Sequence, residues 1–404
     1  MNFLKFITAG NVDDGKSTLL GRLLMDIGKI PLDIVQSVSN KTSSNGEVNL
    51  AYITDGLKKE REEGITIDVS YKYFSIKKRK YIIIDAPGHF EYTRNMFTGA
   101  SNADVILILI DVNLGVTAQT RLHLLLAGML QIKHIYICVN KMDLTDYSNT
   151  DFTKVKDDTS IFAKKNKLKI SGFIPISAIN GDNVVKKSRS MPWYKGRTLF
   201  DILENIKISK EKGLPRAQIQ YSLQHGGEFY HFINLISGSL KVKENLQCSP
   251  SGKKITLKKI LVAGKPAKEV RDNSAVTIQT NDNNLIKRGT YLVSGKIKPK
   301  LKTKNRAIIC CFDQNGIKNG SSFMLKNGCQ NAIANIKIVY YKISGVNLNK
   351  NMDDNKVKIN EIAQILLEFD SKIAIDTSKN NFSTSKFILV DNSSKNTVAA
   401  GYFI

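Results

Sequence analysis

A glycine-rich stretch near the start of the chain limits its possible folds more than any other feature. Residues 10–18 read GNVDDGKST and directly follow the apolar run Phe3–Ala9. In the pattern G-x-x-x-x-G-K-[ST], backbone N–H groups surround phosphates, the lysine neutralises their charge and the hydroxyl binds Mg²⁺. We therefore predict a phosphate-binding loop between a strand and a helix, formed by Gly10, Asn11, Val12, Asp13, Asp14, Gly15, Lys16, Ser17 and Thr18.

Up to about residue 207, short apolar runs alternate with amphipathic stretches. This alternation predicts a mainly parallel sheet with helices on both faces. The expected strands are Phe3–Ala9, Lys80–Ala86, Asp104–Asp111, His134–Lys141 and Gly172–Ser177. The expected helices are Ser17–Met25, Tyr92–Ala100, Thr117–Leu130 and Thr198–Ile206. We interpret residues 1–207 as one α/β domain of the phosphate-loop type.

The pattern changes after residues 209–215, SKEKGLP, which combine charge, glycine and proline and read as a linker. Short alternating segments broken by turn signals follow as far as the C-terminus. They predict two small antiparallel β domains, sandwich or barrel, at 213–298 and 300–404. Within the second, we expect residues 347–358, rich in lysine and asparagine, to form a solvated hairpin loop.

Length and composition favour a multidomain protein without membrane spans. The 404 residues are 42% hydrophobic, enough to build two or three cores. The longest clean apolar run, Val105–Ile110, is far shorter than the roughly 20 residues that span a bilayer. The 5 cysteines form an odd set without a CxxC spacing, which indicates a reduced, cytoplasmic location and no zinc-type site.

The formal charge of +24 suggests an acidic partner at first sight. Lysine supplies most of the basic residues, however, and arginine, the better reader of bases, is scarce. The excess also concentrates in the second half of the chain. Compositional drift and a basic partner-binding face both remain possible, and nucleic acid is the less favoured partner.

Two further segments have the residues that a nucleotide site needs around its terminal phosphate. In DAPGH, residues 85–89, Asp85 ends an apolar run and is placed to hold Mg²⁺ through water, and the Gly88 N–H is placed to meet a γ-phosphate. In REEGITID, residues 61–68, the Thr66 hydroxyl completes the Mg²⁺ shell when that phosphate is present. We therefore expect 61–68 to act as a switch, with Ser17, Thr66 and Asp85 as the metal-binding residues.

The base is predicted from two short motifs at strand ends. In NKMD, which comprises Asn140, Lys141, Met142 and Asp143, the last residue can accept from both N1–H and the 2-amino group of guanine. Adenine offers neither donor, so the same carboxylate would lie buried and unpaired. Ser177 and Ala178 end the next strand, and the Ala178 N–H can donate to O6 of guanine. The predicted ligand is GTP with Mg²⁺.

These motifs together resemble the translational GTPase superfamily, and its elongation factor Tu members in particular. The likeness includes the glycine loop, GITI, DAPGH and NKMD, and it covers nearly all of the chain. It implies two β-barrels after the GTPase domain. It also implies that His89 positions the attacking water, with Lys16 and Thr66 as the other catalytic residues and Asp13 nearby.

Longer strings are more similar to the GTPase subunits of bacterial heterodimeric sulfate adenylyltransferases. They are residues 55–89, 92–101, 177–199, 358–369 and 387–401, and Asp14 stands where elongation factors usually have histidine. This resemblance implies that GTP hydrolysis drives a smaller partner subunit. That partner would bind ATP and sulfate and form adenosine 5′-phosphosulfate and pyrophosphate.

Two other interpretations remain open. One is a translation factor that binds aminoacyl-tRNA, which the basic second half favours and which Asp14 and residues 55–89 oppose. The other is a regulatory GTPase without adenylyltransferase coupling, because residues 224–238 keep little of the usual first-barrel sequence.

Overall fold

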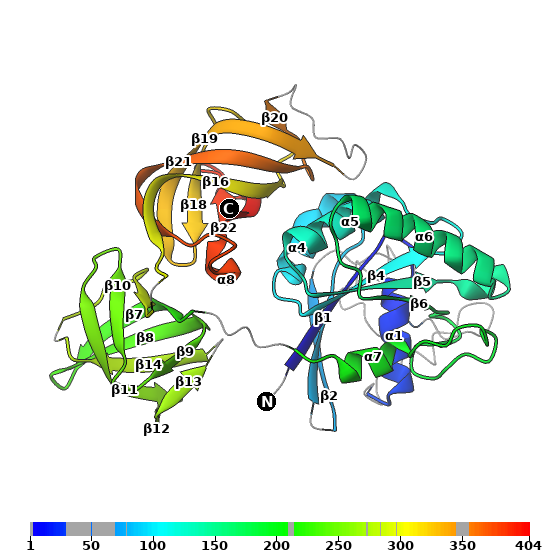
Figure 1. Ribbon diagram of the computed structural model, residues 1–404, viewed down its shortest axis with the longest axis horizontal. Coiled ribbons are helices and arrows are strands. Elements are labelled where there is room, and N and C mark those ends of the chain that lie inside the picture. The colour runs from blue at the N-terminus through cyan, green and yellow to red at the C-terminus, as the bar shows by residue number, and fades with distance from the viewer. Residues whose placement is uncertain are drawn as a thin grey trace. The chain divides into compact units, whose positions relative to one another are not determined.

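The computed structural model of the chain describes residues 3–29, 50, 69–77, 79–208, 214–271, 274–282, 284–295, 297–344 and 355–404 (Figure 1). The chain divides into two compact units, Met1–Ile208 and Ser209–Ile404. The second unit contains both of the antiparallel sheets that follow, and its further division at residues 298–300 stays a prediction.

The first unit is built on a twisted sheet with the order β2-β3-β1-β4-β5-β6. Its strands are β1 (Phe3–Ala9), β2 (Ser70–Ile76), β3 (Arg79–Asp85), β4 (Val105–Asp111), β5 (His134–Asn140) and β6 (Gly172–Pro175). Neighbours pair in parallel from β3 to β6, whereas β2 runs antiparallel to β3. Every residue of β4 is buried, as expected of a central parallel strand covered on both faces.

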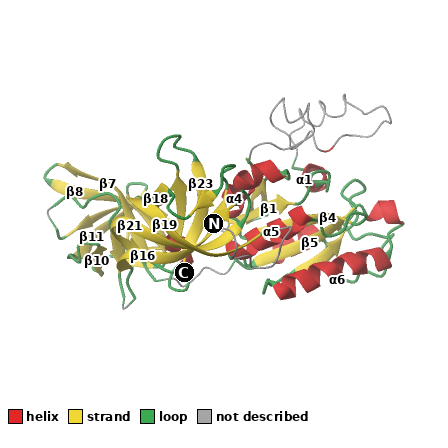
Figure 2. Ribbon diagram, turned by 90° about the horizontal axis from the view of Figure 1, so that it is seen from above, coloured by secondary structure: helices red, strands yellow, loops and turns green. Residues whose placement is uncertain are grey.

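Helices lie on both sides of this sheet (Figures 1 and 2). The elements are α1 (Lys16–Asp26), the 3-10 turn η2 (Phe90–Tyr92), α4 (Thr93–Ala100), α5 (Ala118–Met129), the 3-10 turn η3 (Met142–Thr145), α6 (Asn149–Lys165) and α7 (Leu199–Asn205). Leucines of α1 and α7 pack with Phe6 of β1 in one core. On the opposite face, Gly99 of α4 approaches Ile7 and Ile84.

Helix α6 is longer than any helix expected from the pattern, and the sequence analysis missed it. Its buried residues include Phe152, Val155, Thr159 and Phe162, a narrow stripe in an otherwise charged segment. The start of the helix is nevertheless clear, because the Ser148 side chain accepts a hydrogen bond from the Asp151 N–H.

In the second unit, the first antiparallel sheet has the order β10-β15-β7-β8-β14-β11-β12. Its strands are β7 (Arg216–His225), β8 (Glu228–Ser237), β10 (Asn245–Ser249), β11 (Lys254–Val262), β12 (Lys265–Ala267), β14 (Ser274–Thr280) and β15 (Tyr291–Val293). An additional pairing of β10 with β11 joins the two sides of the sheet into a ring. A small separate ladder pairs β9 (Ser239–Lys241) with β13 (Glu269–Arg271).

The second antiparallel sheet is a closed barrel with the order β16-β21-β19-β18-β22-β23. Its strands are β16 (Lys300–Cys311), β18 (Ser322–Asn327), β19 (Gln330–Ile343), β21 (Ile362–Ile375), β22 (Lys386–Val390) and β23 (Thr397–Phe403), with the short helix α8 (Phe382–Ser385) before β22. Alternate residues such as Ala307 and Ile309 fill its core. The expected fold class, an α/β phosphate-loop domain followed by antiparallel barrels, is confirmed.

The hairpin loop expected at 347–358 needs one correction. Lys356–Val357 forms strand β20, which pairs with β17 (Ile317–Lys318), and Val357 is fully buried. Burial of this one valine in the core favours a strand here, although the residues around it are mostly polar. Residues 345–354 lie outside the described part of the chain.

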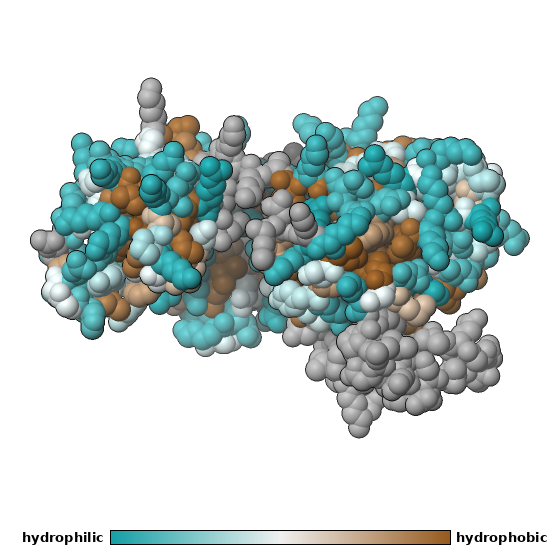
Figure 3. All heavy atoms as spheres, turned by 90° about the horizontal axis from the view of Figure 1, so that it is seen from below, coloured by the Kyte–Doolittle hydropathy of each residue, from teal (hydrophilic) through white to brown (hydrophobic). Residues whose placement is uncertain are grey.

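One face of the molecule is mainly polar (Figure 3). Hydrophilic side chains cover most of the face seen in Figure 3, with smaller hydrophobic areas between them. Across the described ranges, no helix has both the length and the apolar composition that a membrane span requires. The cysteines, Cys138, Cys248, Cys310, Cys311 and Cys329, are free thiols.

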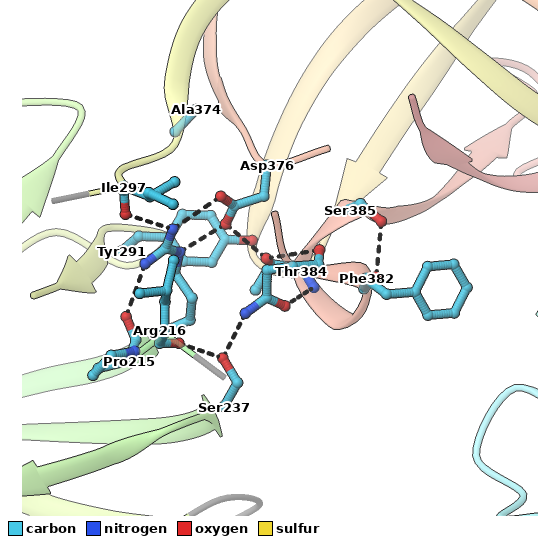
Figure 4. A network of polar contacts seen from close by, with 12 residues as sticks. Pro215, Arg216, Ser237, Tyr291, Ile297, Ala374, Asp376, Phe382, Thr384 and Ser385 are labelled. Carbon is cyan, nitrogen blue, oxygen red and sulfur yellow. Dashed lines mark hydrogen bonds and ion pairs between the residues drawn. The ribbon is translucent and has the colours of Figure 1, made fainter. Parts of the chain in front are cut away.

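A buried ion pair joins the two antiparallel sheets of the second unit (Figure 4). Arg216, at the start of β7, donates through Nε and Nη2 to the two carboxylate oxygens of Asp376 at 2.8 and 3.0 Å. The two side chains are 0% and 1% exposed. Thr384 donates to the same carboxylate at 2.7 Å, and Arg216 also donates to the carbonyl oxygen of Ile297 at 3.0 Å.

These extra hydrogen bonds matter because two buried charges are stable only when their remaining donors and acceptors are satisfied. We predict that Asp376→Ala lowers the free energy of unfolding of the second unit by about 3–5 kcal/mol, because it leaves Arg216 charged and buried. Denaturant titration of the full chain followed by circular dichroism measures the change.

Glu269→Ala is the matched control, because it breaks the exposed Arg271–Glu269 pair of the same unit. This control should cost less than about 1 kcal/mol. Equal losses for the two variants would contradict a special role for the buried pair.

Candidate nucleotide-binding site

The glycine-rich stretch forms the loop between β1 and α1. Gly15 is the N-cap of α1 with φ 87°, and a side chain there would overlap Nδ2 of Asn140. Gly15 makes no side-chain capping hydrogen bond among the described residues, and the N–H groups at a helix N-terminus favour an anion. Ser17 and Thr18 stand in that first turn.

Lys16 is folded back onto this loop. Its side chain is buried and Nζ donates to the carbonyl oxygen of Asn11 at 2.6 Å. Burial lowers the pKa of Lys16, and the nearby carboxylates of Asp14, Asp85 and Asp13 oppose that shift. A buried ammonium group in this position is suited to neutralise phosphate charge.

Asp14 holds the loop from within and does not face the solvent. Its Oδ2 accepts the Asn11 N–H at 2.5 Å, and the residue is almost fully buried. Burial raises the pKa of Asp14 to about 6, against the effects of the Asn11 hydrogen bond and of Lys16. The side chain of Asp14 therefore holds the backbone of the loop at Asn11. Asp13, the neighbouring residue of the loop, is exposed.

The DAPGH segment lies directly against the loop. A side chain at Gly88 would collide with Nζ of Lys16 and lie 2.8 Å from the carbonyl oxygen of Gly10. Asp85, at the end of β3, is buried, and its Oδ1 accepts from Thr8 Oγ1 of β1 at 3.3 Å. The predicted phosphate-sensing segment is thus in direct contact with Lys16.

His89 is exposed at the start of the turn before α4. Its Nδ1 accepts the N–H of Glu91 at 3.4 Å, and its ring lies 5.9 Å from the ring of Tyr92. Thr66, the third residue predicted to act in catalysis, lies outside the described residues.

Sequence reasoning missed two polar residues of α5 behind Gly88. Gln119 Nε2 donates to the carbonyl oxygen of Gly88 at 3.2 Å and lies 3.0 Å from Nε2 of His123. Because an amide nitrogen only donates, Nε2 of His123 is the acceptor. Complete burial, with a smaller contribution from Lys16, lowers the pKa of His123 to about 3. His123 accepts from the glutamine that contacts Gly88, and an isolated histidine on a helix gives no sign of such a contact in the sequence.

At the base end, the side chain of Asn140 joins two loops. Nδ2 donates to the carbonyl oxygen of Asp14 at 2.8 Å, and Oδ1 accepts the N–H of Ala178 at 2.9 Å. A guanine O6 at this position would therefore share the Ala178 N–H with Asn140. Lys141, with φ 63°, forms an ion pair with Asp111 at 2.9 Å.

Asp143 and Ser177 complete this end of the site. Asp143 is half-buried in the first turn of η3. Ser177 is fully buried, and its Oγ accepts the N–H of Asn180 at 3.2 Å, which closes the turn after β6. The NKMD and Ser-Ala segments thus meet through Asn140, and Asn140 also reaches the phosphate loop.

The chain is similar to known families and proteins. The family described as Elongation factor Tu GTP binding domain matches residues 1–221, and the family described as GTP-eEF1A C-terminal domain-like matches residues 304–404. Sulfate adenylyltransferase subunit 1 of Aliarcobacter butzleri is 40% identical, with 98% of this chain and 86% of that protein covered. The chain belongs to the sulfate adenylyltransferase subunit 1 family.

Another member of this family and one solved structure are also similar to the chain. Sulfate adenylyltransferase subunit 1 of Cellvibrio japonicus is 40% identical, with 99% of this chain and 86% of that protein covered. The GTPase-like domain of S. cerevisiae Ski7, solved with GTP, has a TM-score of 0.54 at 16% identity, with 100% and 97% of the two chains covered. The last likeness concerns the fold alone. The resemblance stated from sequence, and with it a GTP-binding enzyme subunit, is confirmed.

The first prediction for the site concerns pH. Because the pKa of His123 is lowered from 6.5 to about 3, the unfolded chain binds more protons than the folded chain between these values. The contribution of His123 to stability is complete above pH 6.5 and is lost as pH falls towards 3. Thermal unfolding of wild type and His123→Asn across this range should show a smaller loss of stability on acidification for the variant.

Asp14 changes the pH dependence of stability in the opposite direction. Because its pKa is raised from 3.8 to about 6, its contribution to stability is complete below pH 3.8 and is lost as pH rises through about 6. Asp14 is present in both proteins, so the difference between their pH profiles isolates His123. Parallel profiles would contradict a neutral, buried His123.

The second prediction concerns the base. Asp143→Asn exchanges an acceptor for a donor opposite the position expected for N1–H and the 2-amino group. Loss of hydrogen bonds to a charged group should weaken GDP binding by at least about tenfold and strengthen binding of xanthosine diphosphate. Competition titrations measure both, and an unchanged preference for guanine over xanthine would place the base elsewhere.

Proposed function

We propose that this chain is the GTP-hydrolysing subunit of a sulfate adenylyltransferase. In this proposal GTP hydrolysis drives the formation of adenosine 5′-phosphosulfate and pyrophosphate from ATP and sulfate on a smaller partner subunit. Family membership over nearly the whole chain supports it. The observation that carries it is the convergence of the glycine loop, DAPGH, NKMD and Ser177–Ala178 through Lys16, Gly88 and Asn140.

The donor set fits Mg²⁺. The hydroxyl of Ser17 and the carboxylate of Asp85 are hard oxygen donors, and Thr8 orients one oxygen of Asp85. Ser17 and Asp85, together with Thr66, are the residues that would hold the ion. When bound, Mg²⁺ supplies positive charge that stabilises the phosphates during transfer.

The remaining steps fall to residues of this chain. Lys16 and the N–H groups of the first turn of α1 bind and orient the phosphates. His89 orients a water molecule towards the γ-phosphorus. The water oxygen forms a bond to phosphorus, the bond between the β–γ bridging oxygen and the γ-phosphorus breaks, GDP leaves with the bridging oxygen, and both water protons stay with the released phosphate. Positioning therefore accounts for most of the catalysis, and His89 need not take up a proton to orient the water.

Coupling to a second nucleotide is physically reasonable for the proposed product. On the partner, a sulfate oxygen would attack the α-phosphorus of ATP and displace pyrophosphate. The resulting mixed anhydride of sulfate and phosphate lies far uphill, so a second source of free energy is needed. The separation of chemistry and energy source between two chains matches the subunit numbering in the relatives' names.

The test uses the complex of this chain with the proteins that copurify with it. We expect adenosine 5′-phosphosulfate formation from ATP and sulfate to rise when GTP is added. In His89→Ala, GTP binding should stay near wild type, whereas GTP hydrolysis and phosphosulfate formation should fall together, by about 100-fold or more. Lys16→Ala serves as the control that loses GTP binding and both activities.

If His89→Ala slowed GTP hydrolysis but left phosphosulfate formation unchanged, coupling would be refuted. Tight binding of aminoacyl-tRNA without any sulfate-dependent activity would instead favour a translation factor. An inactive complex that still hydrolyses GTP would indicate a regulatory GTPase.

A further inference from the structure

One arginine of α1 contacts the loop expected to bind the base. Arg22 lies six residues after Lys16, on the helix whose first turn faces the phosphates. Its Nε donates to the carbonyl oxygen of Ala178 at 3.3 Å, and its Nη2 donates to the carbonyl oxygen of Ile179. A single guanidinium group therefore reaches two successive carbonyl groups of the turn after β6.

The same turn is held from its other side. The Ala178 N–H donates to Asn140 Oδ1 at 2.9 Å, and the Asn180 N–H donates to Ser177 Oγ at 3.2 Å. Consecutive peptide groups of the turn thus have fixed partners in α1, β5 and the turn itself. Because each peptide is planar, holding its C=O also sets the direction of the next N–H.

Packing brings the turn directly onto Arg22. A side chain at Gly181 would lie 3.2 Å from Cδ of Arg22 and 3.1 Å from Oδ2 of Asp26. Asp26 follows Arg22 by one helical turn, and its Oδ1 lies 3.6 Å from Nη1 of Arg22. Burial raises the pKa of Asp26, and the charge of Arg22 opposes that shift. The carboxylate therefore orients the guanidinium group towards the turn.

Arginine is the residue type that this geometry requires. Its planar fork presents several N–H donors in fixed directions, and the charge strengthens each hydrogen bond. Lysine offers a single ammonium group on a flexible chain, which cannot hold two carbonyl groups in the same way. The contact is also specific in position, because it joins the helix of the phosphate site to the loop of the base site.

We propose that Arg22 is a positioning residue for guanine recognition. It fixes the carbonyl groups of Ala178 and Ile179, and with the first the direction of the Ile179 N–H, while Asn140 holds the Ala178 N–H, so that the turn keeps its backbone in place for O6 of the base. Arg22 does not touch the nucleotide in this arrangement. The inference rests on the proposed function, because it requires guanine in this site.

A merely structural role would predict a different result, and Arg79 of β3 supplies the comparison. Arg79 donates to the carbonyl oxygens of Leu203, Glu204 and Ile206 at the end of α7, at 2.6–3.0 Å. Arg79 and Arg22 each join carbonyl groups of one unit through a guanidinium. Within the described part of the chain, however, no residue predicted to bind the nucleotide is among the hydrogen-bond partners of Arg79. Arg79→Met should therefore lower stability without changing base recognition.

The experiment measures binding of three diphosphates with Mg²⁺ to the full chain. GDP and inosine diphosphate carry O6, whereas the 5′-diphosphate of 2-aminopurine riboside lacks it. Arg22→Met should weaken GDP and inosine diphosphate by the same factor, about tenfold, which corresponds to about 1.4 kcal/mol. It should change binding of the 2-aminopurine nucleotide by less than about twofold, since the loss is confined to the O6 contact.

Arg22→Lys keeps the charge and the Asp26 pair and should give a smaller loss with the same dependence on O6. Arg79→Met should lower the unfolding temperature and leave GDP affinity within about twofold of wild type. Equal weakening of the three diphosphates, or no weakening of GDP in either Arg22 variant, would overturn the inference. If the wild-type chain bound ADP as tightly as GDP, the proposed function would fail first, and that result needs no variant.

Discussion

The side-chain amide of Asn140 is the contact on which the rest of the candidate site depends. One end of this amide donates to the phosphate loop at Asp14, and the other accepts from the turn at Ala178. Gly15 must be glycine because Asn140 occupies the space beside it. The phosphate half and the base half of the site are therefore held in register by a single buried residue at the end of β5. In a buried setting, loss of either partner would leave a polar group unsatisfied.

Local patterns were sufficient to predict much of the first unit. Strand β1 matches its expected bounds, and the expected helix after the glycine loop is α1 with small differences at its ends. These elements could be predicted because apolar runs and the G-x-x-x-x-G-K-[ST] spacing are contained within a few residues. Helix α6 was missed because its apolar stripe is narrow. The role expected for Thr66 stays a prediction.

Most of the interactions that were not predicted join residues far apart in sequence. Asp14 is the exception, because its buried carboxylate accepts the N–H of Asn11 only three residues away; its predicted part in ligand binding stays a prediction. Gln119 and His123 reach Gly88 from another helix, and Arg216 finds Asp376 in another sheet. Side chains of these types are ordinary on a surface, so only the fold reveals that they are buried and paired. Val357 shows the reverse case, in which one apolar residue enters the core from a polar segment.

Strand β3 carries different partners at its two ends. Its last residue, Asp85, leads into the segment that lies against Lys16, and its first residue, Arg79, binds the carbonyl end of α7. Hydrogen bonding to β1 and β2 along its length makes β3 a rigid element of roughly 20 Å. Residues 203–206, near the end of the first unit, are consequently bound to the same strand that carries Asp85. Any axial shift of β3 would therefore be transmitted to these residues without a flexible joint in between.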